Sequence, residues 1–99
     1  MKWEIKKFKE LSVDELYRIL ELRNNVFVVE QECIYQDCDR KDLEAYHLFC
    51  IENDKIIATL RKKKKGISYD EISIGRVVVD KLYRRKKLGR KAMEMAIDF

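Results

Sequence analysis

Proline is absent from this sequence of 99 residues, and glycine occurs only three times. No Pro-rich linker and no internal repeat divides the chain, so we expect residues 1–99 to form a single domain. A domain of this length removes somewhat over ~60% of the surface that its unfolded chain exposes, which is enough for one core. No apolar run approaches the ~20 residues that span a bilayer, and no apolar signal-peptide segment follows Met1. These absences predict a soluble, cytoplasmic protein with no membrane partner.

Histidine and cysteine are also scarce, with one histidine and three cysteines in the chain. An odd number of cysteines without a secretory signal predicts reduced thiols. A metal site would have to group Cys33, Cys38, His47 and Cys50. His47 and Cys50 are an odd number of positions apart on one predicted strand, so their side chains point to opposite faces and cannot share a tetrahedral ion. We therefore expect no metal, and a zinc site would require that strand to be absent.

Charged residues make up 40% of the chain, and their signs are unevenly distributed. Residues 61–91 contain 13 lysines or arginines against 3 acidic residues, whereas the remainder contains 9 against 15. Such asymmetry suggests that one part of the surface faces an anion and another accepts a cation. Part of the excess is ordinary solvated surface, because the basic run at residues 61–65 ends a predicted strand and enters a turn at Gly66.

The first part of the chain predicts a strand followed by a long helix. Residues 1–11 alternate apolar and lysine side chains imperfectly, which favours a strand. Ser12 and Glu15 form a capping-box pattern, and apolar residues then recur at helical spacing as far as Phe27. Residues 26–42 become acidic and irregular, and we predict a short helix or loop that lies across a cleft. An EF-hand is excluded there, because the sequence lacks the loop glycine and the closing glutamate.

Two apolar runs, at residues 47–51 and 56–60, predict a β-hairpin, because Asn53 and Asp54 between them tolerate positive φ. A longer turn then precedes a buried strand at residues 72–79. The order strand, helix, helix or loop, hairpin, strand, helix predicts an α/β (α+β) domain. We expect a mixed sheet that is antiparallel in its first half and flanked by helices.

The clearest functional signal is a strand at residues 74–79, a basic loop at residues 81–89 and an amphipathic helix that begins near Arg90. The amides of such a loop and the helix N-terminus present positive ends to one place, which favours an anion. The basic side chains around this cradle are Arg84, Arg85, Lys86, Lys87, Arg90 and Lys91. These groups can form charge-assisted contacts with phosphates. The sequence predicts a phosphate-bearing ligand, although a basic cluster alone is typical of solvated surface.

Three stretches in this order resemble the GNAT superfamily of N-acetyltransferases, and more narrowly its ElaA-type branch. They are LYRILELRNNVFVVEQECIYQDCD (residues 16–39), the pair His47 and Leu48, and IGRVVVDKLYRRKKLGRKAM (residues 74–93). The resemblance covers most of the chain. It implies the N-terminal portion of a GNAT-like acyl-CoA N-acyltransferase fold, with acetyl-CoA as the cofactor.

The resemblance also implies which residues contact the cofactor. In GNAT proteins the fourth strand lends backbone groups to the pantetheine arm, and the next loop wraps the pyrophosphate through a [Q/R]-x-x-G-x-[G/A] motif. The corresponding residues here, with the adjacent arginine, are Val77, Val78, Val79, Arg84, Arg85, Lys86, Lys87, Leu88, Gly89 and Arg90. Lys87 stands where the motif has its first glycine, and we expect its Cβ to avoid a clash only if its φ stays negative.

The implied reaction moves an acetyl group from the thioester to a primary amine by direct attack. An alkylammonium with a pKa of ~10 must first lose a proton, so a base, or a water chain that leads to one, is needed. Glu30 and His47 are the candidate bases; the alternatives are a surface carboxylate and a packed strand histidine. We expect Tyr35, Asp37 and Asp39 to line the acceptor side and to favour a cationic amine, either a small molecule or a protein amino group.

GNAT domains run to roughly 150 residues, so the resemblance implies a domain truncated on its C-terminal side. The tyrosine that serves these proteins as general acid would lie beyond Phe99. A missing parallel neighbour would leave one edge of the last strand open, which predicts a homo-oligomer formed through that edge. Two alternatives are a non-catalytic acyl-CoA-binding relic and a small basic nucleic-acid-binding module that uses residues 61–65 and 84–91. The chain lacks a recognised nucleic-acid motif, so we do not expect nucleic acid as a partner.

Overall fold

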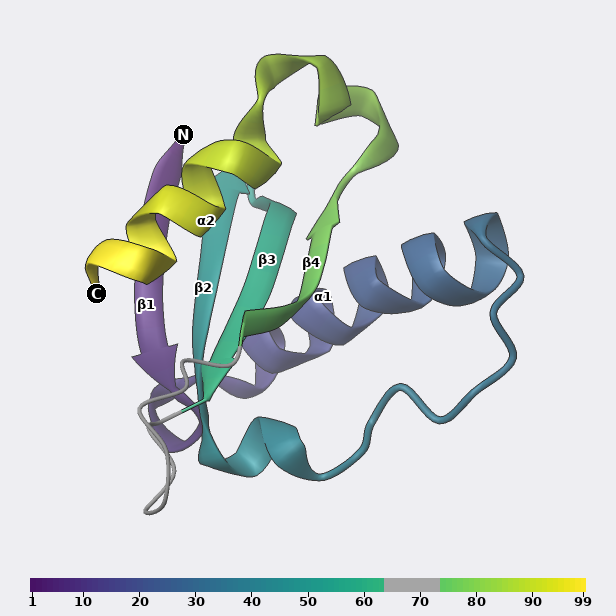
Figure 1. Cartoon of the computed structure of the whole chain (residues 1–99), viewed down its shortest axis with the longest axis horizontal. Coiled ribbons are helices and arrows are strands. Elements are labelled where there is room, and N and C mark those ends of the chain that lie inside the picture. Colours follow the sequence, from purple (N-terminus) through teal and green to yellow (C-terminus); the bar gives the residue numbers. More distant parts are fainter. Residues whose placement is uncertain (64–73) are drawn as a thin grey trace.

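The computed structural model describes residues 1–63 and 74–99. Within them the strands are β1 (Lys2–Lys7), β2 (Ala45–Glu52), β3 (Lys55–Lys63) and β4 (Ile74–Val79) (Figure 1). The helices are α1 (Val13–Asn24), α2 (Leu88–Asp98) and the short turns η1 (Phe8–Glu10), η2 (Asn25–Glu30), η3 (Lys41–Glu44) and η4 (Lys81–Lys86). The predicted turn at Gly66 and positions 72–73 of the predicted last strand lie outside the described residues. No helix in the described part of the chain has the length and apolar character needed to cross a membrane.

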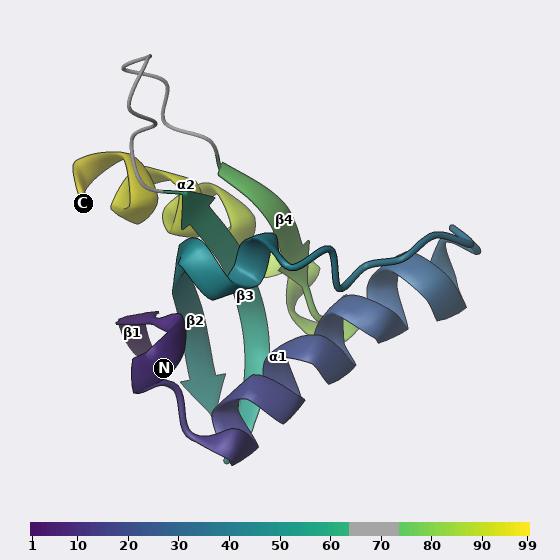
Figure 2. The same ribbon diagram turned by 90° about the horizontal axis from the view of Figure 1, so that it is seen from below.

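The four strands form one sheet in the order β1-β2-β3-β4, and each neighbouring pair is antiparallel. α1 packs on one face of this sheet and α2 on the other (Figure 2). A strand points successive side chains to opposite faces; accordingly, Phe49 of β2 faces α1 and Leu48 faces α2. This arrangement confirms the predicted α+β class and its antiparallel first half, and the pairs among the described strands are all antiparallel.

Three apolar clusters among the described residues hold the helices against the sheet, one beneath α1 and two that include residues of α2; the third contains Cys50, Ile57, Ala58 and Leu88. The cluster beneath α1 contains Ile19, Leu22, Val26, Phe49, Ile56 and Val78, and a cluster beneath α2 contains Leu48, Leu60, Ala92 and Ala96. Ala92 and Ala96 are four positions apart and therefore lie on one face of the helix. Burying a large apolar side chain contributes about 1.5–3 kcal/mol relative to leaving it exposed. These clusters therefore fix both helices to the sheet that carries β4.

The N-terminus of α1 is capped as the sequence predicts. Oγ of Ser12 accepts the amide of Glu15 at 3.0 Å, and Oε1 of Glu15 accepts the amide of Ser12 at 2.9 Å. This reciprocal pair satisfies amides near the helix start. The helix continues past Asn24 as the π-helical turn η2, which confirms the helical spacing as far as Phe27. The predicted first strand is wrong at its end, because β1 stops at Lys7 and the 3₁₀ turn η1 follows.

The hairpin of β2 and β3 is also confirmed. Asn53 and Asp54 adopt φ values of 52° and 59°. Two consecutive left-handed residues match the twist of the flanking strands, and asparagine and aspartate tolerate this conformation. The tolerance of these two residues for positive φ, on which the prediction of the turn was based, is therefore the property that forms it.

β4 contains a bulge that the sequence did not predict. Thr59 pairs with Val78 and Arg61 pairs with Gly75, so two residues of β4 lie opposite the single residue Leu60. Arg76 in this bulge has a φ of 54°, in the left-handed region that side chains rarely adopt. Bulges bend a strand and re-aim a side chain. Here the bulge directs Arg76 to the segment that follows η2.

Candidate cofactor and acceptor site

Asp80 fixes the start of the basic loop directly after β4; together with the first turn of α2, the basic loop spans residues 81–91. Its amide donates to the carbonyl of Ile57 at 2.7 Å, and its Oδ1 accepts the amide of Leu82 at 2.9 Å. The ammonium of Lys55 lies 3.0 Å from Oδ2 of the same carboxylate. Burial alone would raise the pKa of Asp80, but the Leu82 amide and Lys55 hold it below its usual range. The loop is therefore tied to the end of the sheet.

α2 begins at Leu88, two residues before its predicted start, and no side chain among the described residues caps it. The first backbone bond of the helix runs from the amide of Lys91 to the carbonyl of Lys87 at 3.2 Å. The amides of Leu88, Gly89 and Arg90 therefore precede the helical hydrogen bonds. These amides and the helix dipole give this end of α2 a positive potential that favours an anion.

Lys87 adopts a φ of 56°, so the negative φ that would avoid a clash of its Cβ is not observed. A lysine in the left-handed conformation is strained, whereas a glycine adopts it freely. Gly89 does not have positive φ, and a Cβ built on it would lie 3.5 Å from Cγ2 of Val79, which is an ordinary contact. The strain of this turn therefore falls on Lys87, and Gly89 brings α2 close to the end of β4.

Most cations of the basic loop are exposed. Arg85, Lys86 and Lys87 form no ion pair with any side chain in residues 1–63 or 74–99. Nζ of Lys86 lies 5.4 Å from the ring centre of Tyr83, and Arg90 is 3.6 Å from Glu94 one turn further along α2. The loop therefore carries positive charge that is not balanced by the described part of the chain.

The three valines predicted for the pantetheine arm differ in exposure. Val78 is buried in the cluster beneath α1, Val77 is 38% exposed, and Val79 packs against the cluster that contains Leu88. Among the described strands β4 pairs only with β3, so N–H and C=O groups along its other edge have no strand partner. Backbone groups of this edge are the ones that the family resemblance assigns to the cofactor.

Glu30 and Arg84 were predicted for different roles, and the structure brings them together in a bidentate ion pair. Nη2 of Arg84 lies 2.7 Å from Oε1 of Glu30, and Nη1 contacts Oε2. Nε of Arg84 donates to the carbonyl of Val79 at 3.2 Å. The hydrogen bonds from Arg84 hold the pKa of Glu30 below its usual range. In this arrangement Glu30 is a weaker base than a free glutamate.

His47 is 1% exposed and lies inside β2. Its Nε2 is 2.9 Å from the carbonyl oxygen of Asp42, and its ring packs against Phe8 with centroids 6.3 Å apart. Burial holds the pKa of His47 below its usual range. An imidazole that is closed off from solvent and bonded to the backbone has no path to an acceptor amine. This placement favours the alternative of a packed strand histidine.

An arginine–aspartate cluster, buried at Arg23, Asp42 and Arg61 and half-buried at its other members, occupies the predicted acceptor side. Its members are Arg23 of α1, Asp37 and Asp39 of the segment after η2, Asp42 of η3, Arg61 of β3 and Arg76 of β4. Nε of Arg23 lies 2.9 Å from Oδ2 of Asp37, and its Nη1 lies 2.8 Å from Oδ1 of Asp42. Nη1 of Arg61 lies 3.0 Å from the same Asp42 oxygen, and its Nη2 is 2.7 Å from Oδ2 of Asp39. Arg23 is only 1% exposed.

Arg76 joins the bulge of β4 to this cluster. Its Nη2 donates to the carbonyl of Asp37 at 3.1 Å. Its Nε lies 2.8 Å from Oδ1 of Asp37 in an ion pair, although the N–H is not directed along a hydrogen bond. The guanidinium carbon is 5.2 Å from the ring centre of Tyr35, and Phe27 meets that ring edge-on at 6.2 Å. Tyr35 is therefore held beside β4.

The charges of Asp37 and Asp39 are matched by arginines and are not free for a cationic amine. The three arginines and Asp42 were not predicted as members of this site. One signal could have revealed them, because Arg23 falls between Ile19 and Val26 on the apolar face of a helix. A charged residue in that position needs a buried partner.

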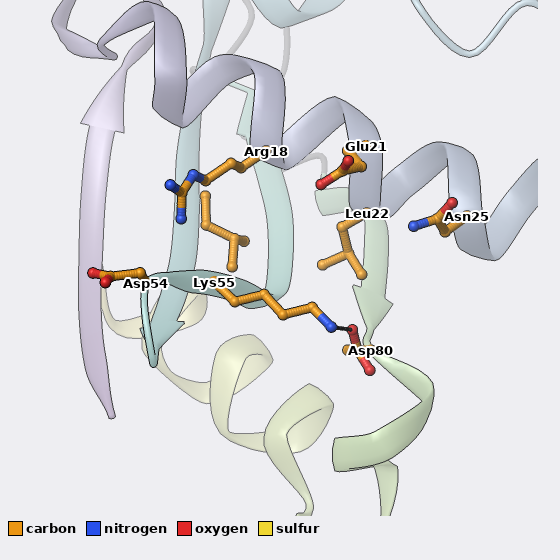
Figure 3. Close-up of a pocket in the computed structure, with 8 residues that line it drawn as sticks. Arg18, Glu21, Leu22, Asn25, Asp54, Lys55 and Asp80 are labelled. Atoms are coloured by element: carbon orange, nitrogen blue, oxygen red, sulfur yellow. Dashed lines mark ion pairs between the residues drawn. The ribbon is translucent and has the colours of Figure 1, made fainter.

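A pocket of about 210 Å³ lies between α1 and the turn of the β2–β3 hairpin (Figure 3). Its lining consists of Arg18, Glu21, Leu22, Asn25, Asp54, Lys55, Ile56 and Asp80. None of the residues predicted for the cofactor, the base or the acceptor is among them. The Lys55–Asp80 ion pair, drawn as a dashed line in Figure 3, lies in the lining of this pocket, and Asp80 directly precedes the basic loop.

Comparison with known proteins assigns most of the chain to one family. Residues 10–99 match the sequence model of the Acetyltransferase (GNAT) family. The chain is 38% identical to protein ElaA of Escherichia coli (strain K12) over 100 aligned positions, which cover 99% of the chain and 65% of ElaA. It is 44% identical to UPF0039 protein C11D3.02c of Schizosaccharomyces pombe over 94 positions, which cover 94% of the chain and 61% of that protein. The chain thus spans less than two thirds of the length of these relatives.

The fold agrees with the sequence comparison. The crystal structure of an acyl-CoA N-acyltransferase from Pseudomonas aeruginosa matches with a TM-score of 0.90 and 37% sequence identity, over 98% of this chain and 68% of that one. The resemblance predicted from the sequence is therefore confirmed by a family match, by close relatives and by the fold. The chain belongs to the acetyltransferase (GNAT) family and has the acyl-CoA N-acyltransferase fold.

Proposed function

We propose that this chain binds acetyl-CoA at the basic loop and acts in the transfer of the acetyl group to a primary amine. One observation carries the proposal: exposed cations, the uncapped amides of α2 and the free edge of β4 meet at one end of the sheet. The pyrophosphate of coenzyme A needs such an excess of positive charge and N–H groups. The similarity to an acyl-CoA N-acyltransferase from Pseudomonas aeruginosa supports acyl-CoA as the class of ligand.

Each part of the site has a proposed task. Arg84, Arg85 and Lys86 contact phosphate oxygens, and the amides of Leu88 and Gly89 complete the cradle. Backbone groups of β4 from Val77 to Val79 bind the pantetheine arm. Bidentate contacts from arginine fix the orientation of a phosphate more firmly than lysine does, because the guanidinium fork matches two oxygens.

Acetyl transfer then requires one bond to form and one to break. The neutral amine nitrogen bonds to the carbonyl carbon of the thioester, the carbon–sulfur bond breaks, and coenzyme A leaves as a thiolate that takes up a proton. The amine gives up a proton, and Glu30 is the proposed acceptor of it, directly or through water. Tyr35, beside Arg76, forms part of the wall for the acceptor, a small amine or a protein amino group. His47 has no part in this proposal, because it is buried.

Calorimetric titration of the 99-residue chain with acetyl-CoA and coenzyme A tests the binding step. We expect saturable binding that becomes about tenfold weaker in Arg84→Gln, because a charge-assisted contact is lost. Lys9→Gln, which removes an exposed cation outside the site, serves as the control and leaves the affinity unchanged. Absence of binding by the folded chain at millimolar ligand would overturn the proposal.

A thiol-release assay with a panel of amines then tests turnover. Binding of acetyl-CoA without release of thiol would limit the function of this chain to binding.

Gly89 offers a matched pair of variants. Gly89→Ala adds only a Cβ in ordinary contact with Val79, so we expect it to fold and to keep most of its affinity. Gly89→Trp fills the space between the start of α2 and the end of β4, and we expect it to abolish binding. Equal affinity of the two variants for coenzyme A would place the ligand elsewhere.

We also propose that residues 1–99 act as one GNAT-like domain and that, while no cofactor occupies it, the free edge of β4 pairs with a second copy of the chain. An unpaired edge offers N–H and C=O groups to another strand. Light scattering at tens of micromolar measures this association, and a monodisperse monomer would contradict it.

A further inference from the structure

The guanidinium of Arg84 uses all three of its nitrogens within the chain. Both Nη groups meet the carboxylate of Glu30, and Nε donates to the carbonyl of Val79. Under the proposed function this same fork has to contact the pyrophosphate, and the same strand edge has to contact the pantetheine arm. Arg84 and the β4 edge at Val79, both proposed to bind the cofactor, are thus hydrogen-bonded to each other. Glu30 holds Arg84 in this position.

From this geometry we infer that Glu30 is an internal competitor of the cofactor: the phosphate displaces it from Arg84, and Glu30 becomes a free carboxylate only after the cofactor has bound. The inference rests on the proposed function and adds an order to it. Cofactor binding comes first, and the base becomes available second. No bond is made or broken in this exchange, because one anion replaces another on the guanidinium.

The Glu30–Arg84 pair is well suited to exchange because it is weak. The side chain of Arg84 is 39% exposed and that of Glu30 is 32% exposed, and ion pairs that water reaches contribute little. Glu30 is also the last residue of η2, where the negative end of the helix dipole disfavours a carboxylate. A pyrophosphate brings more negative charge than one carboxylate, and it meets further cations of the basic loop, such as Arg85 and Lys86. The phosphate therefore wins the competition for Arg84.

Release changes what Glu30 can do. Arg84 is the largest cause of the low pKa of Glu30, so its departure returns that pKa towards the usual range. Two charged groups at the start of the basic loop still face the carboxylate: Lys81 lowers its pKa and Asp80 raises it. Glu32 follows two positions later on its own segment. The exchange thus converts an ion-paired carboxylate into a stronger base.

Calorimetry with coenzyme A on four chains tests the exchange: the wild type, Glu30→Gln, Arg84→Gln and the double variant. Removing the competitor makes Glu30→Gln bind about two- to fivefold more tightly than the wild type, the range expected for an exposed pair. Glu32→Gln removes the same charge from the neighbouring exposed position and leaves the affinity unchanged. In the Arg84→Gln background, Glu30→Gln has no effect, because the competition has lost its target.

A second readout follows the carboxyl carbon of Glu30 by NMR during a pH titration. Saturation with coenzyme A raises the pKa of Glu30, and Arg84→Gln raises it in the same way without any ligand. An unchanged or weaker affinity of Glu30→Gln, an equal gain in Glu32→Gln, or a gain that persists in Arg84→Gln would overturn the exchange while the proposed function stands. If no variant binds coenzyme A, the proposed function fails and the exchange fails with it.

Discussion

Two arginine-rich regions of this chain differ in how their charges are balanced. In the arginine–aspartate cluster, three guanidinium groups meet three carboxylates, and Arg23 and Asp42 are almost inaccessible to water. In the basic loop, Arg85, Lys86 and Lys87 are exposed and form no ion pair within the described part of the chain. The cluster joins α1, η3, β3 and β4, whereas the loop follows Asp80, which ties its start to the end of the sheet.

The difference lies in the partner of each cation, not in the residue type. A buried charge must be paired within the fold, because desolvation without a partner costs several kcal/mol. An exposed cation needs no partner for folding and is available to a ligand. Arg84 combines features of both regions: its side chain is exposed like the others of the loop, and it forms an ion pair like the arginines of the cluster. Substitutions should therefore affect stability in the cluster and binding in the loop.

The largest effect is expected at the centre of the cluster. Asp42→Asn removes the charge that lies between Arg23 and Arg61, so two guanidinium groups lose a buried partner. We expect the free energy of unfolding to fall by about 3–5 kcal/mol. Urea denaturation followed by circular dichroism measures it. Glu44→Gln, an exposed carboxylate on the same short helix, is the control and should shift the value by less than about 0.5 kcal/mol. Equal effects of the two variants would contradict the assigned role of the cluster.

Acid should act on the same cluster. Hydrogen bonds from Arg61 hold the pKa of Asp39 well below its usual range. Burial would raise the pKa of Asp42, but Arg23 and Arg61 hold it below that range as well. A folded pKa below the unfolded value of ~3.9 gives stability that is complete above that value and is lost as pH falls through the folded pKa. The urea concentration at the unfolding midpoint should therefore fall as the pH is lowered below about 4. It should fall less steeply in Asp42→Asn. A constant midpoint down to about pH 2 would exclude this linkage.

Local elements of this fold could be predicted from the sequence because their causes are local. The capping box of Ser12 and Glu15 joins residues three positions apart, and the turn at Asn53 and Asp54 depends on the left-handed tolerance of those two residues. Periodic apolar residues likewise indicated α1, the hairpin and the strand that precedes the basic loop. The strand, loop and helix at residues 74–98 pointed to an anion site by the same local reasoning.

The cluster and the bulge could not be predicted in this way. The hydrogen bonds of the cluster join residues 14, 19, 22 and 39 positions apart, and nothing in the spacing says which aspartate meets which arginine. The bulge depends on the register between β3 and β4, which a single strand does not encode. The pairing of Glu30 with Arg84 could not be predicted either, because the two residues are 54 positions apart. The sequence therefore led to separate roles for Glu30 and Arg84, although the structure joins them in one ion pair.

A smaller effect, of opposite sign, is expected at Lys87. Lys87→Gly relieves the strain of the left-handed conformation, about 1–2 kcal/mol, and loses part of that gain to the greater freedom of glycine in the unfolded chain. We expect a net stabilisation of about 0.5–1 kcal/mol in urea denaturation. Lys87→Ala removes the same charge but keeps the left-handed strain. It therefore distinguishes the effect of backbone strain from the effect of charge. If the alanine variant is stabilised as much as the glycine variant, charge repulsion and not φ is the cause.

The smallest effect on stability is expected at Arg85, and this prediction separates the two regions most sharply. Arg85→Gln removes an exposed cation without an ion pair in the described part of the chain, so the free energy of unfolding should change by less than about 0.5 kcal/mol. The same variant should weaken coenzyme A binding about two- to fivefold, because an exposed cation that loses its phosphate contributes on the scale of a surface ion pair. Calorimetry and urea denaturation on one preparation measure both quantities. A loss of stability without a loss of affinity would mean that the basic loop is a structural element like the cluster, and that its charges are not held for a ligand.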